Sequence, residues 1–265
     1  MQPVNMPIVD VAKRISEEAP YTGGPLEVFE IVGRDTMITL LENGMLPYHR
    51  VLDVGCGALR NGYWLVRFLD AGCYCGIEPQ EKMLNPGLRY SLGDDLVLAK
   101  SPRFSNNKKC DFKVFGNKFD LVFARSIITH GGPGMVCRLF EQFRDHTEDD
   151  AVMLLSYWPN TYLTKARRMF KDKMCMSGDE LPFDDWRFVF VMTYSFQRLH
   201  SWADEYGLAA ENWLERPLIN EQMWLRVTKN NALPRPMRAT ERPKRRSNSG
   251  LHLWSKVIRH RLRPN

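Results

Sequence analysis

Apolar and polar residues alternate along the chain with two different periods, and this pattern predicts a succession of helices and strands. Residues 8–19 and 26–43 carry apolar side chains at helical spacing, and turn residues follow each of them. Strands are expected at residues 50–54, 73–77, around 103–104, 119–124, 151–157, 209–215 and 222–229, and further helices at about 63–69, 80–90, 133–146 and 196–206. Because strands and helices alternate, we predict an α/β fold with a mostly parallel sheet.

The same pattern divides the chain into three parts. Residues 1–49 are expected to form an N-terminal helical cover, and residues 50–230 a single core domain, because no internal repeat is present. Residues 158–194 are longer than a plain crossover needs and combine a basic helical pattern with an aromatic run, so we expect an insertion that covers a pocket. Residues 231–265 are expected to be a basic, largely flexible tail.

Positive charge is concentrated in that tail. The chain of 265 residues has a formal net charge of +6, yet ten lysines or arginines and a single acid lie from residue 231 onward, which leaves −3 for residues 1–230. Leu251, Trp254, Ile258 and Leu262 recur at helical spacing among the basic residues and predict a short amphipathic helix. Such a helix can make weak contact with an anionic membrane or a polyanion, or dock on its own domain.

Three further expectations come from what the pattern lacks. No stretch reaches the roughly 18 consecutive apolar residues of a membrane-spanning helix, so no integral membrane span is expected. The first twenty residues carry acids and bases where a signal peptide is apolar, so we expect a cytoplasmic location. The six cysteines form neither a CxxC pair nor a cluster with histidine, so we expect reduced thiols and no metal site.

Candidate chemistry lies at the end of the first core strand, in Asp53-Val54-Gly55-Cys56-Gly57. A turn without Cβ atoms lets the backbone approach a polar ligand, and Glu78, which ends the next strand, is placed to accept hydrogen bonds from a ribose. The turn and Glu78 together therefore predict a ligand that contains adenosine. Arg60 stands where a dinucleotide-binding turn has its third glycine, which argues against a pyrophosphate. The carboxylate of Asp53 beside the turn repels phosphate and suits an ammonium or sulfonium charge.

With these motifs, the sequence resembles the class I S-adenosylmethionine-dependent methyltransferases over about residues 20–230. The resemblance also rests on residues 74–78, 119–126 and 222–225, and Gly23-Gly24-Pro25 together with residues 58–62 are similar to a bacterial subgroup that acts on small molecules. It implies a Rossmann-like three-layer sandwich whose sheet has seven strands, mostly parallel, with the last strand antiparallel. It also implies S-adenosylmethionine as the cofactor.

The resemblance assigns the cofactor-binding residues. Asp53, Gly55 and Gly57 would hold the methionine end, Glu78 the ribose hydroxyls, and the loop after the third strand the adenine. The full set of cofactor-binding candidates is Asp53, Gly55, Cys56, Gly57, Arg60, Glu78, Pro79, Asn106, Asp111, Phe112, Arg125 and Ser126. Arg60 is interpreted either as a cap of the glycine turn or as a group that holds a carboxylate.

His130 is the catalytic candidate, because it follows the fourth strand at the mouth of the pocket. Methyl transfer is an in-line displacement, so the enzyme must align the acceptor and remove its proton. Alternatively, His130 only hydrogen-bonds the loop or the cofactor's carboxylate. Three aromatic residues, Tyr157, Trp158 and Trp186, either wall an acceptor pocket or pack in the core.

The expected function is methyl transfer from S-adenosylmethionine to an oxygen or nitrogen of a small-molecule acceptor. Two other functions stay open. The first is a methyltransferase-like scaffold that docks on a membrane or polyanion through its basic tail. The second is nucleic-acid methylation, against which stand the position of the basic charge and the sequence Arg125-Ser126-Ile127-Ile128 in place of a stacking loop.

Overall fold

The computed structural model divides the chain into two units, residues 1–234 and residues 235–265. The structure describes residues 6–20, 24–171, 174–180, 190–213, 218 and 221–229, all of which belong to the first unit. The predicted tail and its amphipathic helix lie outside the described residues, as do Gly23 and Trp186. No helix in the described part is long and apolar enough to cross a lipid bilayer.

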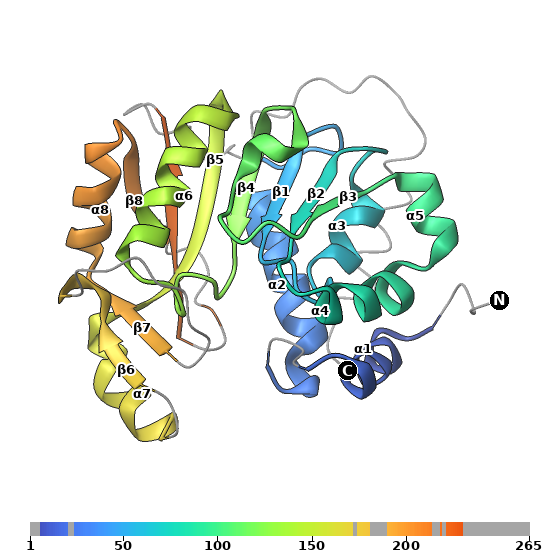
Figure 1. The fold of residues 1–265 in the computed structure, drawn as a ribbon, viewed down its shortest axis with the longest axis horizontal. Coiled ribbons are helices and arrows are strands. Elements are labelled where there is room, and N and C mark those ends of the chain that lie inside the picture. Colours follow the sequence, from blue (N-terminus) through green and yellow to red (C-terminus); the bar gives the residue numbers. More distant parts are fainter. Residues whose placement is uncertain are drawn as a thin grey trace. The chain divides into compact units, whose positions relative to one another are not determined.

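A single twisted sheet organises the first unit (Figure 1). Among the described residues its seven main strands have the order β3-β2-β1-β4-β5-β9-β8, and β9 alone runs antiparallel to its two neighbours. These strands are β1 (Val51–Val54), β2 (Tyr74–Ile77), β3 (Arg103–Ser105), β4 (Phe119–Ala124), β5 (Thr147–Pro159), β8 (Ala209–Trp213) and β9 (Met223–Thr228). The predicted seven-stranded sheet with an antiparallel last strand is confirmed.

Helices cover both faces of the sheet, and the alternation of side chains along β1 shows why. Leu52 and Val54 join the core on one face, under α6 and α8, while Val51 belongs to the core on the other face, under α2 and α3. The helices are α1 (Ile8–Glu18), α2 (Phe29–Glu42), α3 (Gly62–Phe68), α4 (Glu81–Pro86), α5 (Asp94–Lys100), α6 (Pro133–His146), α7 (Leu163–Met169) and α8 (Phe196–Glu205). The predicted three-layer sandwich is therefore also confirmed.

The N-terminal helix α1 packs where the loops after β1 and β2 meet. Its apolar face, with Val11 and Ile15, shares a core cluster with Ala58 and Met83. At its end, the Glu18 carboxylate accepts a hydrogen bond of 2.7 Å from Arg89 and a second from the Tyr90 hydroxyl. Helix α1 thus lies against the residues that surround the glycine turn.

The segment between β5 and α8 adds two parallel strands, β6 (Met174–Ser177) and β7 (Phe190–Tyr194), and β7 pairs with the end of β5. The aromatic residues that precede them are interior. The ring of Trp158 stacks on Tyr162 at 5.2 Å, and the Tyr157 hydroxyl donates to Asn212 Oδ1 at 2.7 Å. Both side chains are buried, which favours core packing over the walls of a pocket.

Two elements depart from the sequence prediction. The single helix expected over residues 80–90 is split into α4 and the π-helix η2 (Gly87–Leu92), and α5 follows it. Pro86 is the last residue of α4, and a Cβ atom on Gly87 would lie 2.5 Å from the Ala58 carbonyl carbon, so the start of η2 packs closely against the backbone that follows the glycine turn. Strand β5 begins at Thr147 because its polar start pairs with β4, which hydrophobicity alone does not reveal.

Short 3₁₀-helices connect several of these elements. They are η1 (Leu26–Val28), η3 (Phe112–Phe115), η4 (Asn160–Tyr162) and η5 (Gly178–Glu180). Of these, η3 lies between β3 and β4, in the region where the adenine was expected.

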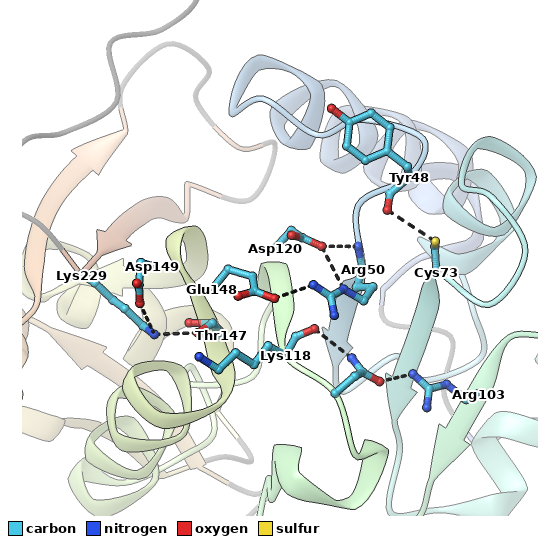
Figure 2. Close-up of polar contacts among 11 residues, drawn as sticks. Tyr48, Arg50, Cys73, Arg103, Lys118, Asp120, Thr147, Glu148, Asp149 and Lys229 are labelled. Carbon is cyan, nitrogen blue, oxygen red and sulfur yellow. Dashed lines mark hydrogen bonds and ion pairs between the residues drawn. The ribbon is translucent and has the colours of Figure 1, made fainter.

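Ion pairs fasten the amino ends of the strands, as Figure 2 shows. The backbone amide of Arg50 donates to Asp120 at 2.7 Å, and its guanidinium donates to Glu148 at 2.5 Å, so one residue ties the starts of β1, β4 and β5 together. Lys229, directly after β9, donates to the Thr147 carbonyl at 2.7 Å and so links the end of β9 to the start of β5. These charged groups satisfy one another at the end of the sheet opposite to the glycine turn.

Candidate active site

The candidate residues gather at the carboxyl ends of the central strands. Asp53 is paired with Gly76 of β2 on one side and with Phe123 of β4 on the other. Because all three strands are parallel, the loops that follow them emerge at the same edge of the sheet, where ligands of open α/β sheets bind.

The glycine turn after β1 is held by β2 and shaped by its lack of side chains. Gly55 and Gly57 have φ values of +75° and +54°, which favour glycine. The Ile77 carbonyl accepts hydrogen bonds from the amides of Gly55, at 2.8 Å, and of Cys56, at 3.0 Å. A Cβ atom on Gly55 would lie 2.0 Å from Cδ1 of Ile127, in the loop after β4. Any side chain at Gly55 would therefore displace that loop.

Glu78 is tied directly to this turn. Its Oε2 accepts a hydrogen bond of 3.0 Å from the Gly57 amide, and its Oε1 accepts one of 2.9 Å from the Gln80 amide. Burial raises the pKa of Glu78, and the two backbone donors oppose that rise. Each carboxylate oxygen keeps a further lone pair, so Glu78 can hold the turn and accept hydrogen bonds from a ligand.

Asp53 lies beneath the turn rather than at the surface. Its side chain is 1% exposed, and Oδ2 accepts a hydrogen bond of 2.9 Å from the Tyr74 hydroxyl. Burial raises the pKa of Asp53 to about 7, against the opposing effects of Tyr74 and Arg60. Its Oδ1 is buried without a hydrogen-bond partner within the described residues. Sequence reasoning missed Tyr74, although a polar hydroxyl in a buried strand beside a strand with a buried acid was a usable signal.

Two buried arginines lie on the same side of the sheet. The Nη1 atom of Arg125, directly after β4, donates to Thr36 Oγ1 of α2 at 2.8 Å. Burial, and next the charge of Arg60, lowers the pKa of Arg125 to about 9. Arg60 follows the glycine turn and acts electrostatically on Asp53 as well. Both predicted cofactor-binding arginines are thus brought together, and α2 supplies a partner that the sequence did not indicate.

Ser126 belongs to a polar cluster across three strands. Its amide donates to Ser156 Oγ at 2.7 Å, and Gln222 Nε2 donates to its Oγ at 3.0 Å. The Ser156 hydroxyl in turn donates to Gln222 Oε1 at 2.6 Å. Ser126 has a φ of +58°, an unusual value for a residue with a side chain. Ser156 and Gln222 were missed as site residues, although a lone serine in an apolar strand was a hint.

His130 lies in the loop that joins β4 to α6. Its side chain is half-buried, and its amide donates to the Ile127 carbonyl at 3.0 Å. The neighbouring Thr129 carbonyl accepts a hydrogen bond of 2.8 Å from the Met192 amide of β7. The loop that carries His130 is thus anchored to the added strands on one side and touches the glycine turn through Ile127 on the other.

The candidates for the adenine region are placed differently from one another. Asn106 is exposed and donates to Glu81 Oε1 at 2.7 Å, while Asp111 accepts a hydrogen bond of 2.9 Å from the Lys113 amide. Phe112 is fully buried, and its ring packs edge-on against Phe119 at 6.3 Å. The ring of Phe112 therefore belongs to the core, whereas Asn106 and Asp111 border the loop after β3.

The remaining predicted residues border the turn. Pro79 is exposed directly after Glu78. Cys56 is buried, and burial raises the pKa of its thiol well above the ordinary value, so it is a small neutral group beside the turn. None of the six cysteines, all of which the structure describes, forms a disulfide bond. Within the described residues, no three His, Cys, Asp or Glu side chains are grouped so that they could hold a metal ion.

Comparisons with known proteins agree with this geometry. The profile of a family described as a methyltransferase domain matches residues 10–212. A comparison with curated protein sequences found no match.

Solved structures share the fold. Magnesium protoporphyrin IX methyltransferase from Synechocystis PCC 6803, with bound SAH, has a TM-score of 0.56 and 17% identity over 83% of this chain and 93% of its own. DesVI from Streptomyces venezuelae has a TM-score of 0.55 and 15% identity, over 85% and 100% of the two chains. The DhpI–SAH complex has a TM-score of 0.54 and 11% identity, over 83% and 95%. From the family match and the fold, the chain belongs to the class I S-adenosylmethionine-dependent methyltransferases.

Proposed function

We propose that the carboxyl edge of β1, β2 and β4 binds S-adenosylmethionine and that the enzyme methylates an oxygen or nitrogen of a small-molecule acceptor. The observation that carries this proposal is the hydrogen bond of 3.0 Å between the Gly57 amide and the Glu78 carboxylate. This hydrogen bond holds the Glu78 carboxylate, which can accept hydrogen bonds from ribose hydroxyls, beside the glycine turn. A ligand can approach that turn closely.

The residues fit such a cofactor in two respects. Gly55 and Gly57 have positive φ values and carry no side chains, so a ligand can approach the backbone of the turn closely. The buried Oδ1 of Asp53 lacks a partner in the described structure and can meet a cation. We assign Asp53, Gly55 and Gly57 to the methionine end and Glu78 to the ribose, with Pro79 and Cys56 as neighbours of the turn.

The adenine assignment is narrower than the sequence indicated. Asn106 and Asp111 border the loop after β3 with polar side chains, so they remain the proposed adenine-binding residues. Phe112 is left out as a side-chain contact because its ring is enclosed in the core.

The bound cofactor supplies a methyl carbon activated by a positively charged sulfur. The chain's own residues must therefore align the acceptor and take up its proton. We propose that His130 takes up the proton of the acceptor. Its loop is held in place by Ile127, which contacts the glycine turn, and by Thr129, which contacts β7. Ser126, held by Ser156 and Gln222, lies four residues earlier in the same loop.

Two observations support a small acceptor. One protein of the same fold is named for a small molecule, magnesium protoporphyrin IX. The acidic balance of residues 1–230 offers a polyanion no general attraction, since the basic excess lies beyond residue 230.

The experiment uses S-adenosylmethionine with a radiolabelled methyl group and three separate acceptor pools: small hydroxyl and amine compounds, polypeptides, and nucleic acids. We expect label only in the small-molecule pool. His130→Ala and His130→Gln should lower kcat by about a hundredfold, the usual size of a general-base contribution, and leave cofactor affinity unchanged. Label in polypeptide or nucleic acid would contradict the proposed acceptor, and an unchanged kcat would remove His130 from the mechanism.

A further inference from the structure

Arg125 is a buried cation with fewer partners than its donors require. Its side chain is 5% exposed, and within the described residues its guanidinium forms a single hydrogen bond, to the neutral hydroxyl of Thr36. The Nε and Nη2 atoms are buried without a hydrogen-bond partner within the described residues. Asp35 of α2 is the acid that acts on it electrostatically, without forming an ion pair with it in the described structure.

The chain satisfies a comparable arginine in a different way. Arg226 of β9 is 3% exposed, and its guanidinium donates to Glu211 Oε1 and to Asn43 Oδ1, each at 2.9 Å. A guanidinium stays charged in proteins, so burying it without an acceptor costs free energy. Arg226 has the partners that a structural arginine needs, and Arg125 lacks them. This contrast indicates that the missing acceptor of Arg125 belongs to a ligand.

Besides Thr36 and Asp35, two groups that can only donate lie near Arg125. Arg60, 9% exposed, adds a second positive charge that acts on it. The Trp224 ring lies 5.8 Å from the Arg125 guanidinium, and its Nε1 is also buried without a partner in the described part of the chain. A negatively charged group with two acceptor atoms complements this set.

The place of Arg125 in the fold connects it to the methyl-transfer site. It leaves β4 directly before Ser126, and Arg60 leaves the glycine turn on β1. Trp224 is on β9, beyond β5, where it is paired with Ser156. Arg125 therefore lies between the glycine turn on one side and the strands β5 and β9 on the other.

We propose that Arg125, with Thr36 and Arg60 beside it, binds the carboxylate of a ligand in the active site. This inference rests on the proposed function. Two sources supply the same chemistry: the carboxylate of the cofactor's methionine end, or a carboxylate on the methyl acceptor. In either case the planar guanidinium binds both oxygens, which a point charge does less well.

The first arm tests the cofactor as the source by calorimetry. S-adenosylhomocysteine carries the carboxylate, whereas 5′-methylthioadenosine has the same adenosine and thioether without it. If the cofactor is the source, Arg125→Met should weaken S-adenosylhomocysteine binding by roughly ten- to a hundredfold and leave 5′-methylthioadenosine binding unchanged. The affinity of Arg125→Lys for S-adenosylhomocysteine should lie between those of the wild type and Arg125→Met. The lysine variant replaces the methionine variant in this test if the latter does not fold.

The second arm tests the acceptor as the source. The Tm of the protein saturated with S-adenosylhomocysteine is measured with acetate and with its neutral isostere acetamide, at constant ionic strength. If the acceptor is the source, acetate should raise the Tm of the wild type and not that of Arg125→Met. Arg144→Met is the control in both arms, because Arg144 is exposed and paired with its neighbour Asp145.

The outcomes separate this inference from the proposed function. If S-adenosylhomocysteine binds, yet Arg125→Met changes neither arm, the carboxylate site is wrong and the methyltransferase function stands. If the wild type binds neither adenosine compound, the proposed cofactor site is wrong, and the acetate arm on the free protein still decides whether Arg125 binds a carboxylate.

Discussion

The hydroxyl of Tyr74 on β2 donates a hydrogen bond of 2.9 Å to Oδ2 of Asp53 on β1. It is the hydrogen bond that links the buried acid ahead of the glycine turn to the neighbouring strand. Burial raises the pKa of Asp53 to about 7, and the Tyr74 hydroxyl is the larger of the two groups that oppose this rise, ahead of Arg60.

Tyr74→Phe should therefore weaken the site through Asp53. Without the donor, the pKa of Asp53 rises above its value of about 7, and less carboxylate is available to a cationic ligand. We expect an unfolding free energy lower by about 1 kcal/mol and an affinity for S-adenosylmethionine lower by several fold at pH 7. Tyr157→Phe is the control, since it removes a buried hydroxyl that donates to Asn212 instead. Equal affinities of the two variants would contradict the role of Tyr74.

Asp53→Asn should be most stabilising at alkaline pH. The pKa of Asp53 is about 7 in the folded protein, against an ordinary value of 3.8, so the folded state holds a proton more tightly than the unfolded state. Stability from this group is complete below about pH 4 and is lost as the pH rises to about 7, by up to about 4 kcal/mol. Tyr74, Arg60 and Glu78 are the groups that act on this carboxyl.

The asparagine variant removes that titration. The difference in unfolding free energy between Asp53→Asn and the wild type, from urea unfolding, should grow between about pH 4 and about pH 7, the range between the ordinary and the folded-state pKa of Asp53, and stay constant at higher pH. S-adenosylmethionine affinity should fall in the variant at pH 8. A difference that stays constant with pH would show that Asp53 does not titrate in this range.

Gly55→Ala should be far more damaging than Gly72→Ala. The two glycines have nearly equal φ values, +75° and +78°, so both substitutions carry a backbone strain of about 1–2 kcal/mol. Only at Gly55 would the added Cβ atom meet Cδ1 of Ile127, at 2.0 Å, whereas nothing lies within 4 Å at Gly72. We expect Gly55→Ala to abolish cofactor binding and Gly72→Ala to preserve it.

A second substitution checks the cause. Ile127→Ala combined with Gly55→Ala should recover part of the lost stability, measured by thermal unfolding, because it removes the atom that collides. No recovery would mean that the turn itself, rather than the loop after β4, fails to accept the side chain.

Arg125→Met should not reduce stability, in contrast to Arg226→Met. Removing a buried guanidinium that lacks an ion pair in the described structure removes a desolvation cost, so the unfolding free energy should stay the same or rise. Arg226→Met leaves Glu211 and Asn43 without their donor and should cost roughly 1–3 kcal/mol, since Glu211 is partly exposed. Urea unfolding measures both. A large loss of stability in Arg125→Met would assign that arginine to the core.

The sequence predicted the fold well where local pattern and tertiary structure agree. The buried strands at 51–54 and 119–124 are apolar apart from one aspartate each and are bounded by turns, so hydrophobicity sufficed. The sequence prediction failed at 87–100, where the chain forms η2 and α5 and where Gly87 packs against the Ala58 backbone. Tertiary contacts of this kind leave no periodic signal.

The candidate site shows the same division. The glycines and Glu78 follow strand ends, and strand ends can be located from sequence. Thr36, Tyr74, Ser156 and Gln222 come from elements distant in the chain, and only the pairing of strands and the packing of α2 bring them to Arg125, Asp53 and Ser126. The sequence assigned Phe112 to the adenine because of its position after the third strand. Its ring instead packs in the core against Phe119.

The most direct test of the account is calorimetric titration of S-adenosylhomocysteine into the wild type, Glu78→Gln and Glu148→Gln. Glu148 is the matched control, because it pairs with Arg50 at the opposite end of the sheet. We expect the wild type and Glu148→Gln to bind alike and Glu78→Gln to bind at least about tenfold more weakly. A wild type that does not bind, or a Glu78→Gln variant that binds as tightly as the wild type, would contradict it.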